Sequence, residues 1–357
     1  MIPHGMNRRS FIFSSTAAML SAPMAGYSLS SGSKIRIGMI GTRHAHASGK
    51  IKAIRDQSDT FELVGVVEND PVRRRELAND DLYSGVTWLT EEQLLNVKDL
   101  HVVAVETEVK QLVPTAMRCI EAGLHIHHDK PGGTSLPEFR KLLEKAEANG
   151  CIVQMGYMLR YNRAFQFMYH AVREGWLGNI MEIDCMMGKL ANPSTRNDIG
   201  QFSGGGMFEL GAHVIDSIIH MLGKPLSVTP FSHTTQPDGI ADNQLAVLDF
   251  EQAIATVRIN HMDPFGGPRR RFQISGDKGT IEIQQLESGD LTLYLDEPHG
   301  RYQKGEQQVS LGQDGRYDGE FRDLAKVIRG EKPFDWSYEH DLHTHEALLR
   351  ASGMSTG

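Results

Sequence analysis

Apolar and polar positions alternate in two different ways along this chain, and the change comes near residue 156. Before it, short apolar runs alternate with segments in which apolar residues recur at helical spacing. The runs that predict strands cover residues 35–40, 63–67, 102–105, 125–127 and 152–155, and the segments that predict helices cover 45–55, 109–122 and 136–149. Strands that alternate with helices are typical of a parallel sheet covered by helices. We predict an α/β domain of this kind over residues 32–155.

After residue 156, strands follow one another closely, and turn signals such as Gly-Asp-Lys-Gly at 276–279 separate several of them. The expected strands are 181–188, 227–234, 245–250, 253–260, 271–275, 280–284 and 291–295, and the expected helices are 165–174, 207–222, 321–329 and 338–351. This pattern predicts an α+β domain over residues 156–357, with a mainly antiparallel open sheet and helices on one face. Because the other face stays uncovered, we expect a homodimer or homotetramer.

The first 31 residues fit neither pattern. Arg8 and Arg9 precede an apolar stretch, residues 11–24, that is too short to span a bilayer and has no polar face. A paired arginine before such a stretch is typical of a bacterial twin-arginine export signal. We therefore predict that residues 1–31 are an export signal and that the protein is periplasmic or otherwise exported. No other apolar run reaches about 18 residues, so we expect no membrane-bound mature form.

Composition narrows the classes of partner. The 357 residues include 37 Lys and Arg against 45 Asp and Glu, a formal net charge of −8, which argues against nucleic acid or an anionic membrane as the main partner. Apolar residues make up 40% of the chain, as in ordinary globular proteins, which argues against disorder. The three cysteines are too few for a disulfide framework, and we expect buried free thiols.

The turn after the first expected strand has the position of a dinucleotide-binding loop. Residues 36–46 read RIGMIGTRHAH, and the amides where the next helix begins would meet a pyrophosphate. Relative to the pattern G-x-G-x-x-G, Gly41 supplies the first glycine, whereas Arg43 and His46 replace the second and third. Arg43 must then point away from the phosphate or contact it with its charge. The candidate cofactor-binding residues of this Rossmann-type segment are Gly38, Gly41, Thr42, Arg43 and His44.

Two residues at later strand ends join the candidate cofactor site. Glu68 follows the second expected strand, where its carboxylate would accept hydrogen bonds from ribose hydroxyls and repel a 2′-phosphate. This placement favours NAD over NADP, whereas for an isolated glutamate a solvated position at a strand end is the commoner explanation. Thr107 follows the fourth expected strand.

Closely spaced histidines raise the question of a metal ion. His44 and His46 stand one residue apart, but they lie at a turn that enters a helix, and no carboxylate or thiolate motif accompanies them in the sequence. We therefore predict no metal site. His340, His343 and His345 lie on a polar C-terminal helix, where we expect them to face solvent.

Three further motifs resemble those of one family. Residues 125–133 read HIHHDKPGG, and Asp-Lys-Pro here is similar to the Glu-Lys-Pro that ends the fifth strand in the Gfo/Idh/MocA family, the relatives of glucose-fructose oxidoreductase and inositol dehydrogenase. Residues 156–162 (GYMLRYN) resemble the opening of the family's second domain, and residues 204–216 (GGGMFELGAHVID) resemble its triple-glycine motif. The resemblance runs in order over nearly the whole chain after residue 31. It implies a Rossmann NAD-binding domain followed by a domain for substrate binding and oligomerisation.

The resemblance also implies an NAD-dependent oxidoreductase that acts on a CH–OH group of a sugar or polyol. Lys130 would hold a substrate hydroxyl or polarise a forming carbonyl, and together with Asp129 it would contact the cofactor. His213 would take the hydroxyl proton, and Glu209, one helical turn earlier, would orient His213 or bind the substrate. The expected substrate-binding residues are Tyr157, Arg160, Glu209 and His213. Where the family usually has Glu and Asp, this chain has Asp129 and Glu209, so we expect a reshaped site.

Export bears on the expected reaction. Free NAD should be scarce outside the cytoplasm, so we expect a cofactor that stays bound and is reoxidised in place. One closed cycle oxidises one sugar and reduces another. In a second, an NAD-dependent glycoside hydrolase or lyase oxidises a sugar transiently so that a glycosidic bond is eliminated, with Tyr157, Asp216 or a histidine as the extra acid–base group. A non-catalytic protein that senses a nucleotide or sugar is the alternative from another class.

Overall fold

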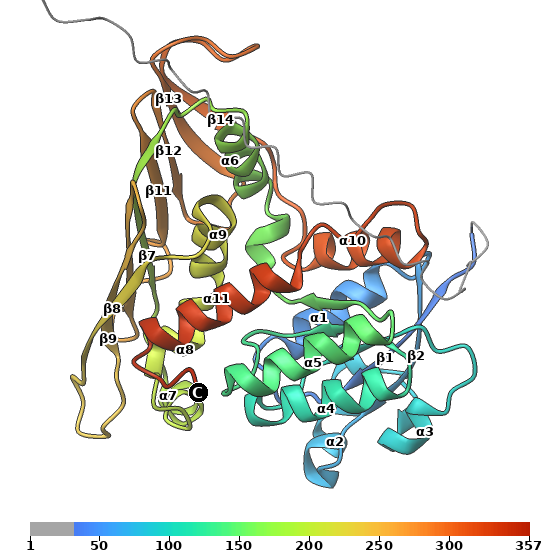
Figure 1. Cartoon of the computed structure of the whole chain (residues 1–357). Helices are drawn as coiled ribbons and strands as arrows, with labels where there is room; N and C mark the ends of the chain where they lie inside the picture. The colour runs from blue at the N-terminus through green and yellow to red at the C-terminus, as the bar shows by residue number, and fades with distance from the viewer. Residues whose placement is uncertain (1–31) are drawn as a thin grey trace, which may run out of the picture.

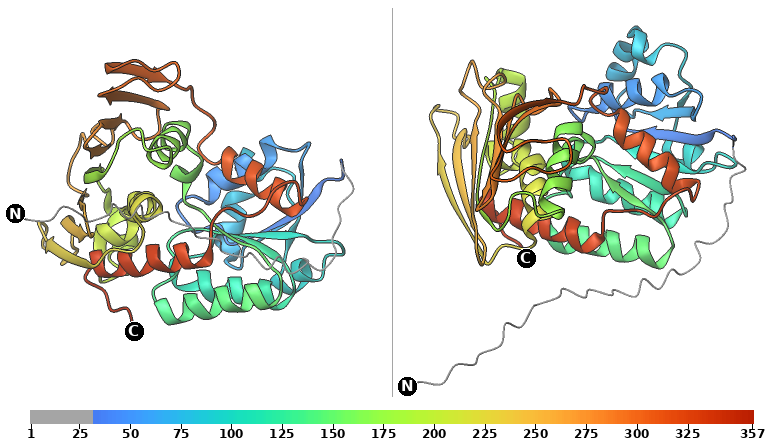
Figure 2. Two further views of the ribbon diagram at one scale, coloured as in Figure 1. Left: turned by 45° about the horizontal axis from the view of Figure 1, so that its top comes forward. Right: turned by 90° about the horizontal axis from the view of Figure 1, so that it is seen from above.

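The computed structural model describes residues 32–357, which fold around two β-sheets (Figure 1). The predicted export signal, residues 1–31, lies outside the described residues. Helices of the second half lie between the two sheets, as the views in Figures 1 and 2 show together. The two sheets correspond to the two patterns in the sequence.

The first sheet has the strand order β3-β2-β1-β4-β5-β6, and its strands pair in parallel. Its strands are β1 (Ile35–Ile40), β2 (Phe61–Val67), β3 (Trp88–Leu89), β4 (Val102–Val105), β5 (His125–His128) and β6 (Val153–Met155). The connecting helices are α1 (Ala47–Asp56), α2 (Pro71–Leu77), α3 (Glu91–Leu95), α4 (Val109–Glu121) and α5 (Leu136–Ala148), with a 3-10 turn, η1, at Asp81–Tyr83. Every residue of β4 is buried, as expected of a strand covered on both faces. This sheet confirms the predicted Rossmann-type fold.

The second sheet has the strand order β14-β13-β12-β11-β7-β10-β9-β8, and its pairs are antiparallel except for β7 with β10. Its strands are β7 (Ile180–Gly188), β8 (Ser227–His233), β9 (Asn243–Asp249), β10 (Ile254–Asn260), β11 (Arg271–Gly276), β12 (Gly279–Gln284), β13 (Asp290–Leu295) and β14 (Gly305–Ser310). Burial alternates along β9 and β10, which leaves one face of the sheet uncovered. The mainly antiparallel sheet with helices on one face is therefore confirmed.

Helices from the end of the chain join the two halves. The helices of the second half are α6 (Arg163–Arg173), α7 (Pro193–Ile199), α8 (Gly205–Leu210), α9 (Ala212–Leu222), α10 (Asp318–Ile328) and α11 (Tyr338–Ala351), with a 3-10 turn, η2, at Met158–Tyr161. Helix α11 packs against α8 and α9 and also against α5 of the first domain, while α10 packs on α1 (Figure 1). The last two helices thus connect the two halves of the chain through these contacts.

Two expectations about helices were wrong. The expected helix 207–222 is divided at Gly211 into α8 and α9. The histidines of α11 do not all face solvent: His345 is fully buried, and His340 Nε2 lies 2.8 Å from Asp216 Oδ1. The reason is that α11 is wedged between helices of both domains, so the polar residues on it meet protein rather than water.

The cysteines Cys119, Cys151 and Cys185 are free and buried, as predicted. Burial raises the pKa of the Cys119 thiol to about 12, so this thiol stays protonated at neutral pH. Among the residues that the structure describes, no helix combines the length and the apolar character needed to cross a bilayer.

Candidate active site and dinucleotide site

The C-terminal ends of β1, β4 and β5 bring distant segments to one edge of the first sheet. Ile40 of β1 pairs with Val105 of β4, which pairs in turn with His128 of β5. The residues after these strands therefore lie side by side, and they are the turn 41–46, Glu106 with Thr107, and Asp129 with Lys130. Strand order reverses at β1 and β4, the position where open α/β sheets bind ligands.

A pocket beside this turn gathers five of the predicted cofactor residues. Gly41, Thr42, Arg43, Glu68 and Thr107 are among its lining residues. Gly41 has a φ of +91°, and a Cβ there would lie 2.6 Å from the backbone nitrogen of Thr107, so the turn excludes a side chain. Thr42 Oγ1 donates to the Glu68 carboxylate. The Glu68 side chain is only 6% exposed. Glu68 is thus held at the pocket rather than solvated.

These residues fit the adenosine half of a dinucleotide. Glu68 offers a carboxylate to a ribose diol, and the turn after Gly41 offers backbone amides to a pyrophosphate. Arg73 Nε donates to Thr42 Oγ1 at 2.9 Å and lies 4.0 Å from Glu68, which places a positive charge beside the carboxylate. The pocket therefore holds the donors and acceptors that NAD requires.

Gly38 and Arg43 differ in what they do at this site. Gly38 lies inside β1, and a Cβ there would come within 2.7 Å of the Leu94 side chain. Its absent side chain allows α3 to pack on the sheet, so the predicted cofactor contact of Gly38 is corrected to a packing role. Arg43 is exposed, pairs with Asp70, and lines both the pocket and the neighbouring cleft.

His44 and His46 turn away from the pocket and toward the interior. His44 Nε2 lies 3.0 Å from the carbonyl oxygen of Lys130, and His44 Nδ1 lies 3.1 Å from Asp129 Oδ2. His46 Nδ1 lies 3.0 Å from Asp129 Oδ1. The side chains of His44 and Asp129, both predicted to contact the cofactor, are therefore engaged with each other behind the nucleotide loop.

Lys130 lies in a cleft that residues of both domains line, among them His44, Lys189, Phe208 and Glu209. It is 3% exposed, and its Nζ donates to the backbone oxygen of Glu209 at 2.6 Å. Burial lowers the pKa of Lys130, although the charges of Glu209 and Asp129 oppose this shift. An ammonium group has three donors, so Lys130 keeps donors for a substrate oxygen while it holds the Glu209 carbonyl.

His213 lies near the start of α9 and is 1% exposed. Its Nδ1 has no hydrogen-bond partner within residues 32–357. Burial and the positive charge of Lys130 hold the pKa of His213 well below its ordinary value of 6.5. His213 is therefore neutral near pH 7 and can accept a proton from a substrate hydroxyl.

Glu209 does not orient His213 as predicted. Its carboxylate accepts from Lys189 Nζ at 3.1 Å and lies 3.0 Å from His261 Nε2, while its backbone carbonyl holds Lys130. The division between α8 and α9 accounts for this, because Glu209 and His213 then belong to separate helices. Although burial opposes the shift, His261 and the charges of Lys130 and Lys189 lower the pKa of Glu209 well below its ordinary value. Glu209 is thus an ionised group on the substrate side of the cleft.

Arg160 has a structural role in place of the predicted substrate contact. Its side chain is fully buried, its Nη2 donates to Asp216 Oδ1 at 2.7 Å, and Nη2 also pairs with Asp341. The guanidinium lies over the rings of Tyr157 and Trp336, with 4.6 and 4.1 Å to the ring centroids. Two carboxylates and two rings occupy Arg160, so the side chain does not face the cleft.

Tyr157 is also buried, and its hydroxyl has no hydrogen-bond partner among the described residues. Its ring centroid lies 6.4 Å from that of His213. Burial, together with the charge of Asp216, raises the pKa of Tyr157 well above its ordinary value, so the hydroxyl keeps its proton.

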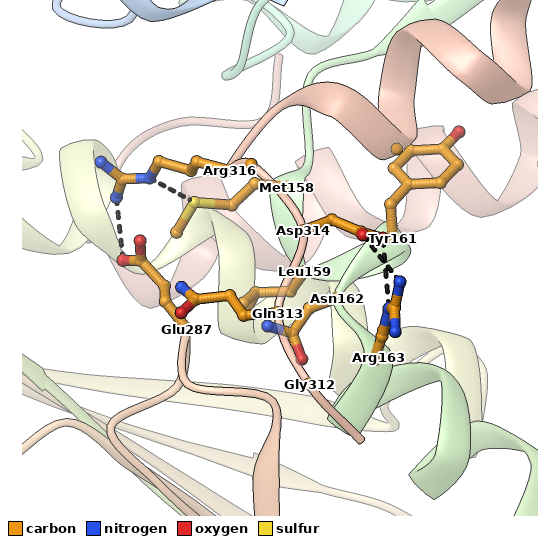
Figure 3. A pocket seen from close by; sticks show the side chains of 12 residues that line it. Met158, Leu159, Tyr161, Asn162, Arg163, Glu287, Gly312, Gln313, Asp314 and Arg316 are labelled. Atoms are coloured by element: carbon orange, nitrogen blue, oxygen red, sulfur yellow. Dashed lines mark hydrogen bonds and ion pairs between the residues drawn. The ribbon is translucent and has the colours of Figure 1, made fainter. Parts of the chain in front are cut away.

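The fold brings to the cleft several groups that were not predicted from the sequence. Lys189 follows β7 and His261 follows β10, and neither lies in a recognisable motif. A second pocket, shown in Figure 3, is lined by η2 and the loop before α10, and none of its lining residues is a predicted site residue. Arg316 in this loop donates to Met158 Sδ at 3.0 Å and to Glu287 at 2.9 Å, and its charge helps to lower the pKa of both Lys130 and His213.

Comparison with known families covers both halves of the chain. Residues 35–157 match GFO_IDH_MocA, described as an oxidoreductase family with an NAD-binding Rossmann fold. Residues 165–282 match the GFO/IDH/MocA C-terminal domain. Together the two matches span more than half of the chain.

Curated relatives are distant in sequence. The uncharacterized oxidoreductase YhhX of Escherichia coli is 26% identical over 217 residues, which is 59% of this chain and 61% of that protein. The chain thus spans less than two thirds of this relative. The myo-inositol 2-dehydrogenase of Thermotoga maritima is 22% identical over 306 residues, 84% of this chain and 87% of that protein.

Solved structures share the fold at lower identity. The WlbA dehydrogenase of Chromobacterium violaceum, in complex with NADH and UDP-GlcNAcA, has a TM-score of 0.77 at 18% identity. The likeness covers 92% of this chain and 96% of that one. The architecture of the two sheets is therefore shared with a structure that holds a nicotinamide dinucleotide.

Proposed function

The chain belongs to the GFO/IDH/MocA oxidoreductase family, and on this premise we propose that it uses NAD to oxidise a hydroxyl group of a sugar or polyol. Its first half is the NAD-binding Rossmann domain of that family. A relative named for myo-inositol supports a polyhydroxylated substrate. The polar groups of the cleft support it as well, because each can pair with one hydroxyl.

The observation that carries the proposal is the meeting of Lys130 and His213 from two domains. Lys130 follows β5 of the first sheet, and His213 lies on α9, which covers the second. Lys130 Nζ holds the carbonyl oxygen of Glu209, four residues before His213. The His213 ring lies 5.8 Å from that of His46, which bonds to Asp129, the residue before Lys130. A positive donor and a neutral base near one site are what removal of a hydroxyl proton requires.

The two side chains have separate tasks in the reaction. His213 accepts the hydroxyl proton, because burial keeps its ring neutral. Lys130 stabilises the negative charge that grows on the substrate oxygen, and burial strengthens this interaction. When bound, NAD supplies the acceptor for the hydride that leaves the substrate carbon. Glu209, ionised beside Lys189 and His261, can accept hydrogen bonds from other substrate hydroxyls.

The pH profile of kcat/KM is expected to have an acid limb and an alkaline limb, each displaced to lower pH than an ordinary histidine or lysine would give. Activity requires neutral His213, so it should be lost as the pH falls through a value well below 6.5. Activity also requires protonated Lys130, whose pKa is below its ordinary value of 10.5, so it should be lost as the pH rises through that lowered pKa. His213→Asn should lower kcat by about 100- to 10,000-fold and remove the acid limb.

Steady-state kinetics across the pH range check this prediction. His220→Asn is the matched control, because His220 lies on the same helix but is exposed. An acid limb at the ordinary histidine pKa, or one that persists in His213→Asn, would assign the base to another group.

Cofactor choice is expected to depend on Glu68. Glu68→Ala should reduce the preference for NAD over NADP by at least about tenfold, or 1.4 kcal/mol. The variant loses the acceptor for the ribose hydroxyls, and it frees Arg73 to meet a 2′-phosphate. Calorimetric dissociation constants for both dinucleotides measure the effect, with the exposed Glu62→Ala on β2 as the control. An unchanged ratio in Glu68→Ala would mean that another group selects the cofactor.

Export and cofactor retention extend the proposal. Arg8 and Arg9 before an apolar stretch support export by the twin-arginine route, and an exported enzyme needs a cofactor that stays bound. The bound cofactor is then reduced and reoxidised without leaving the protein. Detection of the mature chain in the periplasmic fraction, still carrying nucleotide, tests both points, and a nucleotide-free periplasmic protein would contradict retention.

A homodimer or homotetramer joined through the second sheet completes the proposal. Phe231 of β8 and Ile254 of β10 lie on its uncovered face and are 52% and 54% exposed. Apolar side chains on an open sheet face favour association between copies. The molar mass in solution tests it, and a monomer at micromolar concentration would contradict it.

Elimination of a glycosidic bond after transient oxidation is the second candidate reaction. Tyr157 favours it, because its protonated hydroxyl is unpartnered in the described chain and its ring centroid lies 6.4 Å from that of His213. This hydroxyl can give a proton to a leaving oxygen. Product analysis separates the two reactions, since only elimination releases a second sugar or aglycone.

A further inference from the structure

Four side chains next to Lys130 and the cleft have no task in the proposed oxidation. They are His44, His46, Glu106 and Asp129, which we call the inner cluster. They come from the ends of β1, β4 and β5, and the two acids are fully buried while the two histidine side chains are 6% and 11% exposed. The sequence could not indicate such a group, because the carboxylates lie far from the histidines along the chain.

The spacing within the inner cluster is that of metal ligands. His44 Nδ1 lies 3.1 Å from Asp129 Oδ2, and His46 Nδ1 lies 3.0 Å from Asp129 Oδ1. The possible ligand atoms of these three residues all lie within 4.8 Å of one another. Ligand atoms of a tetrahedral site with bonds of about 2.0–2.1 Å lie about 3.3 Å apart. Small movements would therefore place all three around one ion.

The hydrogen bonds of His44 determine where its ring carries hydrogen. Its Nε2 faces the carbonyl oxygen of Lys130, which can only accept, so Nε2 is the protonated nitrogen. Nδ1, the other ring nitrogen, accepts from the backbone N–H of His46 at 3.3 Å. It also lies 3.1 Å from a carboxylate oxygen of Asp129. A cation between Nδ1 and this oxygen would have a ligand atom on either side.

The outer hydrogen bond of His44 is also typical of a metal ligand. Histidines bound to metal ions commonly donate their second ring N–H to a carboxylate or a backbone carbonyl, which fixes the ring. His44 donates in this way to Lys130.

Glu106 brings a second buried carboxyl group to the inner cluster. Both of its oxygens are buried, and neither receives a hydrogen bond from any residue in the described chain. Its Oε2 lies 3.9 Å from His44 Nδ1, within reach of a shared ion. Burial and the charge of Asp129 raise the pKa of Glu106 well above its ordinary value, so without an ion this carboxyl group keeps its proton, which a bound cation would displace. The ammonium group of Lys50, on α1, is already bound to Glu320.

A second group of similar composition differs from the inner cluster because it contains a guanidinium group. Asp216, His340 and Asp341 also place possible ligand atoms within 4.8 Å of one another. Arg160 binds both carboxylates there, so no further cation is needed. This group provides a control for metal binding.

We propose that the inner cluster binds a divalent transition-metal ion through His44 Nδ1, His46 Nδ1 and Asp129, with Glu106 as the fourth ligand. Imidazole with carboxylate favours Zn²⁺ and related ions, whereas Mg²⁺ and Ca²⁺ prefer oxygen ligands alone. The ion would join the ends of three strands beside Lys130 and so stabilise the floor of the cleft. Metal binding at this site requires no substrate, so its test is independent of whether the proposed oxidation is correct.

Metal titration of the full chain tests this site. The protein carries an affinity tag without histidine, is treated with a chelator, and is titrated with Co²⁺, whose visible absorption reports the coordination; Zn²⁺ is then added as competitor. We expect about one equivalent of Co²⁺ per chain, displaced by Zn²⁺. His46→Gln and Asp129→Asn should each weaken Co²⁺ binding by at least about tenfold, and His340→Gln should bind as the wild type does.

Circular dichroism verifies that each variant is folded, and His44→Gln replaces any variant that is not. A wild-type chain that takes up no Co²⁺ overturns the proposal, whatever the variants do. Variants of the inner cluster that bind as tightly as the wild type also overturn it. So does an equal loss in His340→Gln, because the ion would then lie in the other group.

Discussion

Replacing Lys130 by alanine is expected to lower kcat/KM for the sugar or polyol substrate by about 100- to 1,000-fold. Lys130 is 3% exposed, and its ammonium group is held by the Glu209 carbonyl at the cleft, where the proposed reaction requires it to bind the substrate oxygen. Removal of one preorganised donor aimed at developing charge costs about 2.7–4 kcal/mol of transition-state stabilisation. The loss should lie mainly in kcat, because the charge on the oxygen develops during the reaction.

Two variants make this result specific. Lys98→Ala is the control, because its ammonium group is 91% exposed and remote from the cleft, and its kinetics should match the wild type. Lys130→Arg should not restore activity, because a planar guanidinium does not fit a site built for a compact ammonium group. Turnover at the wild-type rate in a folded Lys130→Ala protein would remove Lys130 from the mechanism.

Replacing Arg160 by methionine is expected to lower the free energy of unfolding by about 3–5 kcal/mol. The substitution leaves Asp216 and Asp341 buried without the guanidinium that binds both of them. Loss of one partner from a buried ion pair has this cost, because the charge that remains stays desolvated. Urea denaturation measures the change.

A second arginine variant tests whether the loss of stability depends on burial of the ion pair or only on the loss of an arginine. Arg163→Met removes a half-exposed arginine that pairs with Asp314 at the surface, and such a pair contributes about 0–1 kcal/mol. Equal losses in the two variants would contradict the role of the buried cluster. An Arg160→Met protein as stable as the wild type but with weaker substrate binding would restore the predicted substrate contact.

The sequence was sufficient for most of the fold because buried strands have a strong apolar pattern. β1 and β4 are apolar runs bounded by turns and helices, and both were predicted. β3 has only two residues, and β14, which reads GEQQVS at the sheet edge, has no apolar pattern, so neither was expected. The break between α8 and α9 escaped prediction because the apolar spacing continues across Gly211.

The position of a candidate site residue could be predicted where it follows from the strand before it. Glu68 and Lys130 lie where β2 and β5 end, at the C-terminal edge of the first sheet, and the structure puts one at the pocket beside the turn and the other in the cleft. Arg160 differed, because the acids that bind it come from helices α9 and α11. Side-chain partners from distant elements are set by tertiary packing, which periodicity along one segment does not report.

The inner cluster also could not be predicted from periodicity along one segment. In the sequence pattern, His46 replaces the third glycine of the phosphate loop. In the structure, its ring lies 5.8 Å from that of His213 and bonds to Asp129. Only the pairing of β1 with β4 and of β4 with β5 brings these groups together.

The nicotinamide spectrum of the purified protein is the most direct test of a self-contained sugar oxidation. Protein purified without added nucleotide is mixed with members of a panel of sugars and polyols, and the absorbance of reduced nicotinamide is followed. We expect the absorbance to rise with at least one of them, with no NAD added, and to stay constant in Lys130→Ala. A wild-type protein that shows no change with any compound, before or after loading with NAD, would contradict the proposed function.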